Sequence, residues 1–185
     1  ITYTIANNVE NLTLTGSSDI DATGNASANI ITGNSGANIL SGGDGNDTLD
    51  GGSEADTLNG GDGNDTLDGG SGADTLNGGS SYDYLYGGDG DDYLYGKSGG
   101  DYLYGGAGDD NLYGGNGNDT LIGGAGNDTY VVDSTSDTVT ENSSEGTDTI
   151  QSSVTYTASN NVENLTLTGS CLLYTSPSPR DCRLS

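Results

Sequence analysis

A nine-residue unit is repeated in tandem along the middle of this chain. The stretch "GGDGNDTLDGG" occupies residues 42–52 and returns unchanged at residues 60–70. Each unit is close to G-G-x-G-x-D-x-L-x, and the units begin at Gly42, Gly51, Gly60, Gly69, Gly78, Gly87, Gly96, Gly105, Gly114 and Gly123. A fixed period of this kind makes each unit pack mainly against its neighbours, so the sequence predicts a solenoid.

The sixth and eighth positions of the unit carry its most regular side chains. The eighth position is Leu in nine units and Tyr130 in the last. Two weaker units, which begin at Gly24 and Gly33, precede the array and have Asn29 and Asn38 at the sixth position. In all ten regular units the sixth residue is Asp: Asp47, Asp56, Asp65, Asp74, Asp83, Asp92, Asp101, Asp110, Asp119 and Asp128.

The unit divides into a short strand and a turn. The three residues around the eighth position alternate polar, apolar and polar, which is typical of a strand with one side chain facing inward. The six residues of the type "GGDGND" are expected to form the turn, because glycine permits positive φ and a close approach of the backbone to a ligand. If each turn reverses the chain, two units complete one coil of eighteen residues. We therefore predict an all-β fold, a parallel β-roll with two repeats per coil and a β-rich flanking cap.

This coil places alternate Asp residues in register on each edge of the roll. One column is Asp47, Asp65, Asp83, Asp101 and Asp119, and the other is Asp56, Asp74, Asp92, Asp110 and Asp128. At a strand spacing of about 4.8 Å, neighbouring carboxylates repel by roughly 1 kcal/mol in water and by several times more at lower dielectric. Cations are therefore expected between them.

The available ligands indicate which cation. The turns offer carboxylate and carbonyl oxygens, the chain has no His, and the array contains no Cys. Many flexible oxygen ligands favour calcium over zinc, and over magnesium with its strict octahedron. Five carboxylates on each edge leave four gaps, so about eight calcium ions are expected. The candidate backbone ligands are the carbonyls of Gly43, Gly45, Gly61, Gly63, Gly70, Gly72, Gly88, Gly90, Gly106, Gly108, Gly115 and Gly117.

Three units depart from the pattern. Glu54 and Ser81 replace the fourth-position glycine, and Lys97 replaces a second-position glycine. Calcium sites that touch these turns are expected to be weaker.

Composition excludes several classes of function. Lys and Arg number 3 against 28 Asp and Glu, and the net charge of -25 opposes binding to nucleic acid or anionic membrane. No apolar run is long enough to span a membrane. The repeat accounts for the carboxylates and no His is present, so no enzymatic site is expected. One buried Leu per unit is too little apolar surface to offset the ordering of nine residues, so metal binding and folding should be a single event.

Residues 24–131 closely resemble the calcium-binding nonapeptide repeats of RTX, or haemolysin-type, proteins. The resemblance rests on the ten tandem G-G-x-G-x-D-x-L-x units. It implies a parallel β-roll, secretion of an unfolded chain from the bacterial cytosol by type I secretion, and folding on contact with external calcium. The implied location is outside the cell or on the bacterial surface, in a larger exoprotein such as a toxin or adhesin.

Two other functions remain open. Seven tyrosines flank the buried Leu positions and should face outward in ladders eighteen residues apart: Tyr84, Tyr86, Tyr93, Tyr95, Tyr102, Tyr104 and Tyr113. Aromatic pairs across strands stabilise a sheet, but an exposed aromatic face also suits a glycan or protein partner. The chain could equally be an accessory domain of a secreted enzyme or toxin.

The flanks suggest further modules. Residues 2–17, "TYTIANNVENLTLTGS", return at residues 155–170 as "TYTASNNVENLTLTGS". We interpret residues 1–23 as the end of a preceding module or a flanking β segment, and residues 132–170 as a β-rich cap and the start of the next module. Residues 171–185, "CLLYTSPSPRDCRLS", resemble the translation of a transposase-type sequencing adapter and are interpreted as a non-native tail. The alternative for this tail is a disulfide between Cys171 and Cys182.

Overall fold

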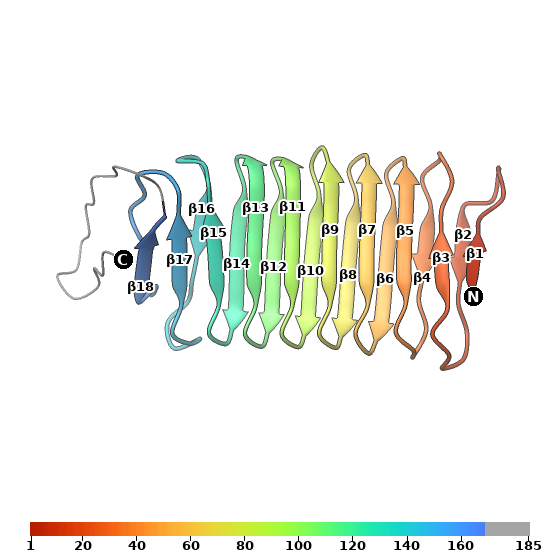
Figure 1. Cartoon of the computed structure of the whole chain (residues 1–185), viewed down its shortest axis with the longest axis horizontal. Coiled ribbons are helices and arrows are strands. Elements are labelled where there is room, and N and C mark those ends of the chain that lie inside the picture. The colour runs from red at the N-terminus through yellow and green to blue at the C-terminus, as the bar shows by residue number, and fades with distance from the viewer. Residues whose placement is uncertain (169–185) are drawn as a thin grey trace.

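A computed structural model describes residues 1–168, and the regular secondary structure in this part of the chain is entirely β (Figure 1). The interpretation of residues 171–185 therefore lies outside the described residues. The strands are β1 (Thr2–Thr4), β2 (Asn11–Thr13), β3 (Asp21–Thr23), β4 (Ile30–Thr32), β5 (Ile39–Asp44), β6 (Thr48–Ser53), β7 (Thr57–Asp62), β8 (Thr66–Ser71), β9 (Thr75–Ser80), β10 (Tyr84–Asp89), β11 (Tyr93–Gly99), β12 (Tyr102–Ala107), β13 (Asn111–Gly117), β14 (Thr120–Ala125), β15 (Thr129–Val132), β16 (Thr138–Thr140), β17 (Thr149–Ser152) and β18 (Asn164–Leu167).

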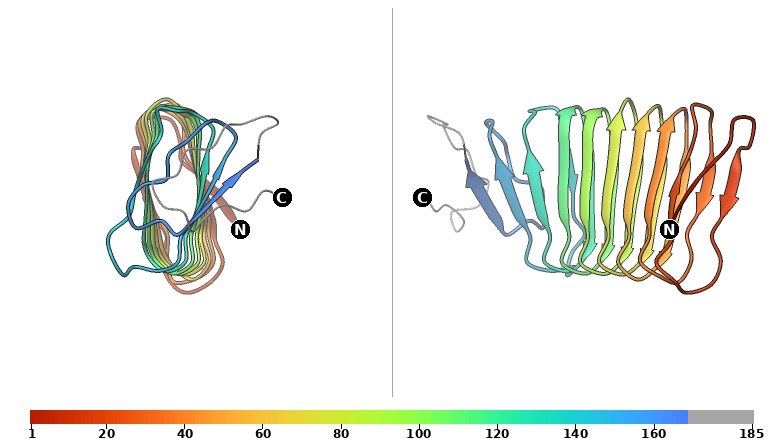
Figure 2. Two further views of the ribbon diagram at one scale, coloured as in Figure 1. Left: turned by 90° about the vertical axis from the view of Figure 1, so that its left-hand side faces the viewer. Right: turned by 45° about the vertical axis from the view of Figure 1, so that its right-hand side comes forward.

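Successive strands alternate between two parallel sheets. The odd-numbered strands and β18 form a ten-stranded sheet, and the even-numbered strands from β2 to β16 form an eight-stranded sheet. Each strand pairs with the strand one coil away, as Leu49 of β6 does with Leu67 of β8, eighteen residues later. The view along the long axis shows the flattened coils superposed (Figure 2). The prediction of a parallel β-roll with two repeats per coil is confirmed.

The strands are longer and the turns shorter than the sequence suggested. A typical strand in the array begins at the seventh position of one unit and ends at the third position of the next, as Thr48–Ser53 does. The sequence had suggested strands of three residues. The first two glycines remain within the strand, and the second-position glycines pair across coils, as Gly43 does with Gly61. The bend itself begins at the fourth position, where Gly45 has φ 120°. Glycines permit this geometry because they bring no side chain into the narrow roll.

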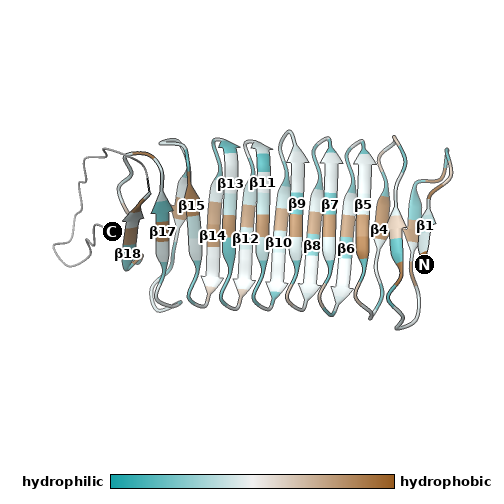
Figure 3. Ribbon diagram, viewed as in Figure 1, coloured by the Kyte–Doolittle hydropathy of each residue, from teal (hydrophilic) through white to brown (hydrophobic). Residues whose placement is uncertain are grey.

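The interior contains one row of apolar side chains from each sheet, with a single side chain from each strand of the array. The eighth-position leucines are completely buried, and Ile31 and Tyr130 continue these rows at opposite ends. These residues form the apolar band halfway along the strands in Figure 3. Each strand of the array thus contributes one leucine-sized side chain to the core, flanked by polar residues and glycine.

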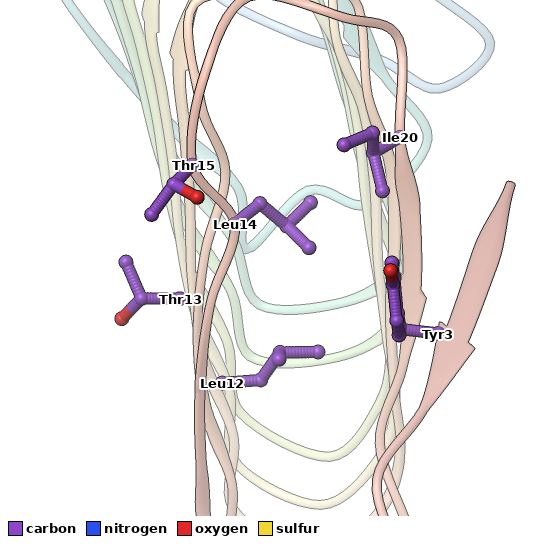
Figure 4. Close-up of a pocket in the computed structure, with 6 residues that line it drawn as sticks. All are labelled: Tyr3, Leu12, Thr13, Leu14, Thr15 and Ile20. Atoms are coloured by element: carbon purple, nitrogen blue, oxygen red, sulfur yellow. The ribbon is translucent and has the colours of Figure 1, made fainter.

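A pocket at the first coil marks the N-terminal end of this interior (Figure 4). Leu12 and Leu14 point inward from one wall and Ile20 from the other, whereas Thr13 and Thr15 point away. The pocket contains no charged lining residue. Its apolar residues Leu12, Leu14 and Ile20 belong to or pack against the core, so the pocket is continuous with the interior of the roll.

The segment after the array continues both sheets. β16 pairs with β14, β17 with β15, and β18 with β17. Ile150 of β17 is completely buried beside Tyr130 in the ladder. The last coils therefore cover the C-terminal end of the repeat core.

The tyrosines lie on the outer faces of the sheets, as predicted. The rings of Tyr95 and Tyr113 stack with centroids 4.7 Å apart, and those of Tyr84 and Tyr102 lie 5.9 Å apart in a tilted arrangement. Tyr93 is 45% exposed and Tyr104 39% exposed. The predicted ladders are present, and their outer edges reach solvent.

Candidate metal centre

The ten sixth-position aspartates lie at the two edges of the roll, where the turns connect the sheets. Each is at most 2% exposed. Oδ1 of each accepts a hydrogen bond from the backbone N–H of the sixth-position residue one coil earlier, at 2.6–2.9 Å. This eighteen-residue step brings the aspartates together in the two columns that the sequence predicted.

The second carboxylate oxygen of each aspartate has no partner. Oδ2 is buried and without a hydrogen bond in all ten residues, from Asp47 to Asp128. Such groups are costly in a folded protein, because burial removes the water that would solvate them. Lys97 is the only basic side chain among residues 1–168, and its ammonium lies 4.7 Å from the centre of the Tyr95 ring. Ten buried acceptors therefore lack a donor from the described chain.

First-position glycines make room for these oxygens. A β-carbon on Gly60 would overlap Oδ2 of Asp65 and would lie 2.6 Å from the carbonyl oxygen of Gly78 in the next coil. A carboxylate and a carbonyl oxygen thus face the same space beside a glycine Cα. The same pairing of oxygens occurs at seven first-position glycines, Gly42, Gly51, Gly60, Gly69, Gly87, Gly96 and Gly105.

The predicted backbone ligands have two different environments. Among the described residues, the fourth-position carbonyls of the turns accept no backbone hydrogen bond; these are the carbonyls of Gly45, Gly63, Gly72, Gly90 and Gly108. The second-position glycines lie within paired strands, as Gly43 and Gly61 do. The carbonyls of both groups stay predictions as ligands. The first-position carbonyls are additional candidates that the sequence did not single out.

Electrostatics across the columns favours neutralisation. Burial raises the pKa of Asp110 to about 8. Repulsion from Asp128 and Asp92 adds to this rise, whereas the hydrogen bond from the Asp92 N–H lowers the pKa. Burial likewise raises the pKa of Asp83 and of Asp92 to about 7. Burial thus favours a protonated carboxyl or a bound cation over a free carboxylate near neutral pH.

The two weaker units that precede the array show the contrast. Asn29 and Asn38 occupy the same place as the aspartates, and Nδ2 of Asn38 donates to the carbonyl of Ile20 at 2.7 Å. Their Oδ1 atoms accept N–H groups from their own turns, those of Asn25 and Asn34. The asparagines are satisfied without a charge, so the requirement for a cation begins with the aspartates.

Three acidic residues after the array extend the columns, and a fourth lies beside them. Asp137 accepts the Asp119 N–H at 3.2 Å, and Asp148 accepts the Asp128 N–H at 2.9 Å. Glu163 in turn accepts the Asp148 N–H at 2.9 Å. Sequence reasoning missed these residues because the glycines of the unit are absent after the array, although Asp137 keeps the nine-residue period, and because a two-residue insertion displaces Asp148. The available signal was the triplets "DTV" at 137–139 and "DTI" at 148–150, which repeat the "DTL" of the array.

Glu141 is the fourth of these missed acidic residues. It is buried at 7% exposure, and both of its carboxylate oxygens lack a hydrogen bond. Burial, followed by repulsion from Asp148 and Asp128, raises its pKa to about 8. This residue takes the place of a first-position glycine, because it follows Thr140, which pairs with Ile122, and lies eighteen residues after Gly123.

The donor set fits a hard cation, since paired carboxylate and carbonyl oxygens converge and unpartnered buried oxygens recur in every coil. Comparison with protein families agrees with this chemistry. The sequence matches the RTX calcium-binding nonapeptide repeat (4 copies) at residues 23–58, 41–76, 50–85, 68–103, 95–130 and 104–139. The chain belongs to this family. It is an RTX calcium-binding β-roll, and the family is a structural calcium-binding repeat rather than an enzyme class.

A search of curated proteins found no match to this RTX chain. The described residues contain no helix that is long and apolar enough to cross a membrane.

The departures from the RTX unit adopt the backbone that glycine would adopt. Lys97 has φ 78°, Glu54 φ 71° and Ser81 φ 85°. Left-handed backbone is unfavourable for residues with a β-carbon, so these three turns carry local strain. Their weaker calcium binding stays a prediction.

Proposed function

We propose that this RTX β-roll is a calcium-dependent folding module of a secreted bacterial protein, in which calcium binding at the turns and formation of the roll are one event. The observation that carries the proposal is the set of ten buried, unpartnered Asp Oδ2 atoms. An ionised carboxylate without a partner opposes burial. A cation that binds only the folded chain removes this cost and adds its binding free energy to folding.

The proposed ligands are the sixth-position carboxylates together with first- and fourth-position carbonyls. Two columns of five aspartates have four gaps each, so we propose about eight calcium ions in the repeated turns. The ions supply charge neutralisation and links between coils rather than a chemical reaction. The regular turns are expected to bind more tightly than those that contain Glu54, Ser81 or Lys97.

We propose that the chain acts outside the cell because its folding is coupled to calcium binding. Calcium sites of extracellular modules have dissociation constants of about 10⁻⁴–10⁻³ M, so a chain of this kind would stay open at low cytosolic calcium. We propose that the chain leaves the bacterial cell unfolded and closes in external calcium.

The number of bound ions tests the turn sites directly. Native mass spectrometry of the full chain, after chelation and stepwise addition of calcium, is expected to reach about eight ions in the turns. One or two ions at saturation would contradict the stacked arrangement. A matched titration with magnesium measures selectivity and is expected to give little binding.

The exposed tyrosines support a second candidate function. Tyr82, Tyr84, Tyr93 and Tyr104 are each about two-fifths exposed on the outer faces of the roll. Exposed aromatic side chains in a group suit a glycan or protein surface. In this alternative, calcium supplies rigidity and the aromatic faces supply the binding.

A further inference from the structure

Three carboxylates converge where the repeat array ends. Asp128 immediately precedes β15, Glu141 immediately follows β16, and Asp148 immediately precedes β17. One carboxylate oxygen from each residue lies within 4.8 Å of the others, and all three side chains are buried. Even strands end and odd strands begin at the same edge of the roll, which is why these residues meet (Figure 1).

The cluster presents unpartnered oxygens. Glu141 is 93% buried, and neither of its carboxylate oxygens has a hydrogen bond. Asp128 uses Oδ1 to accept the Asp110 N–H, and its Oδ2 is buried without a partner. Oδ1 of Asp148 accepts the Asp128 N–H at 2.9 Å. At least three oxygens of this cluster therefore remain free to accept a ligand.

Nearby side chains do not neutralise the cluster. Glu145 also lies close, but its carboxylate accepts the backbone and side-chain N–H groups of Asn142 at 3.0 and 3.2 Å. Oη of Tyr130 and Oδ2 of Asp128 both lie beside the Cα of Gly123, where a β-carbon would overlap them. This hydroxyl is a further oxygen near the carboxylates.

We infer that Asp128, Glu141 and Asp148 form a separate calcium site at the C-terminal end of the repeat array. It differs from the turn sites because Glu141 stands where the repeat has a first-position glycine, eighteen residues after Gly123, and adds a third carboxylate. An all-oxygen donor set of three carboxylates suits calcium, and a larger ligand charge raises affinity. The site therefore binds calcium more tightly than the two-aspartate turns and links β16 to β15 and β17.

Neutralisation of Glu141 tests the site. Full-length wild type, Glu141→Gln and Glu145→Gln are titrated with calcium after chelation, and bound ions are counted by native mass spectrometry. Glu141→Gln is expected to hold one ion fewer than wild type, with the tightest binding step weakened about tenfold or more. Glu145→Gln, the matched control, is expected to retain the wild-type count and first step. An unchanged count and first step in Glu141→Gln would overturn the inference.

Diffraction from the wild-type chain decides the matter if Glu141→Gln does not fold. Crystals grown with calcium are expected to show an ion about 2.3–2.6 Å from a carboxylate oxygen of each of the three residues. Ions in the repeated turns with none here would overturn this inference and leave the proposed turn sites intact. An ion bound here, with none in the repeated turns, would support this inference and overturn the proposed turn sites.

Discussion

The backbone N–H of Asp65 donates a hydrogen bond of 2.8 Å to Oδ1 of Asp83, one coil further along the roll. The same carboxylate leaves Oδ2 buried and without a partner. One side chain thus joins two coils through one oxygen and presents the other to the space beside a first-position glycine. In the proposed function, one oxygen of each aspartate thus serves structural pairing and the other is available to a metal ion.

An asparagine in place of a column aspartate should separate these two roles. In Asp65→Asn the amide oxygen can still accept the Asp47 N–H, while the amide nitrogen can donate to a carbonyl. Asp65→Asn is expected to bind one or two fewer calcium ions and to be more stable in chelator by about 1 kcal/mol or more, because a buried unpaired acceptor is removed. Asp44→Asn, an exposed control, should change neither quantity. Calorimetry counts the ions, and circular dichroism in chelator as pH falls from 8 to 5 measures the folded fraction; an unaltered ion count in Asp65→Asn would refute the assignment.

The buried columns predict an unusual dependence of metal-free stability on pH. Burial raises the pKa of Asp110 to about 8 and that of Asp92 to about 7, from an ordinary value of 3.8. The folded chain then holds protons that the unfolded chain releases, so this contribution to stability is complete below pH 4 and is lost as pH rises to about 8. In calcium-free buffer, β-structure measured by circular dichroism should therefore increase as pH falls from 8 to 5.

Calcium should reverse this trend, because protons compete with the ion for the same carboxylates. Calcium affinity is expected to fall as pH decreases from 8 to 5. Metal-free stability that instead rises with pH would show that the columns are already paired within the chain.

The first-position glycine provides a steric test. A β-carbon at Gly60 would overlap Oδ2 of Asp65, whereas one at Gly100 would have no neighbour closer than 3.4 Å. Gly60→Ala is expected to weaken calcium binding at that turn and to lower the free energy of unfolding by about 1–3 kcal/mol, in the range for overpacked sites. Gly100→Ala should be close to wild type in calorimetry and denaturation. Equal effects of the two substitutions would show that the space beside Gly60 has no special role.

The tyrosine ladders are testable through a multiple substitution. Replacing Tyr84, Tyr86, Tyr102 and Tyr104 by Thr, the residue at the seventh position of the earlier coils, removes the pairs at 5.9 and 6.2 Å. We expect calcium-dependent folding to persist with a loss of roughly 1 kcal/mol or more of stability. Binding to glycan arrays and cell surfaces should be undiminished. A folded variant that loses surface binding would instead support the adhesive function.

The sequence was sufficient for the fold because one pattern repeats without interruption. Leu at every eighth position predicts the inward side chain, and Asp at every sixth predicts the columns, so an error in one coil is corrected by the next. Strand length was less predictable. Glycines at the first two positions are typical of turns in isolation, yet here they lie within strands: Gly43 pairs with Gly61 across coils at a positive φ of 114°.

The additional acidic residues were harder to identify for a physical reason. Asp148 follows Asp128 by twenty residues rather than eighteen, and Glu141 occupies the place of a first-position glycine, a position that carries no ligand side chain in the repeat. Their convergence depends on how β16 and β17 dock on the roll, which a local pattern does not encode. The unpartnered oxygens could not be predicted either, because they depend on which carboxylate oxygen accepts the N–H of the neighbouring aspartate.

The coupling of calcium to folding is tested most directly by far-ultraviolet circular dichroism of the full chain during a calcium titration at pH 7.5. The account predicts a spectrum of an unfolded chain in chelator and a cooperative change to β-structure as calcium reaches about 1 mM, with magnesium at the same concentration giving little change. A chain that is already fully β-structured in chelator, with a spectrum unchanged by calcium, would contradict it.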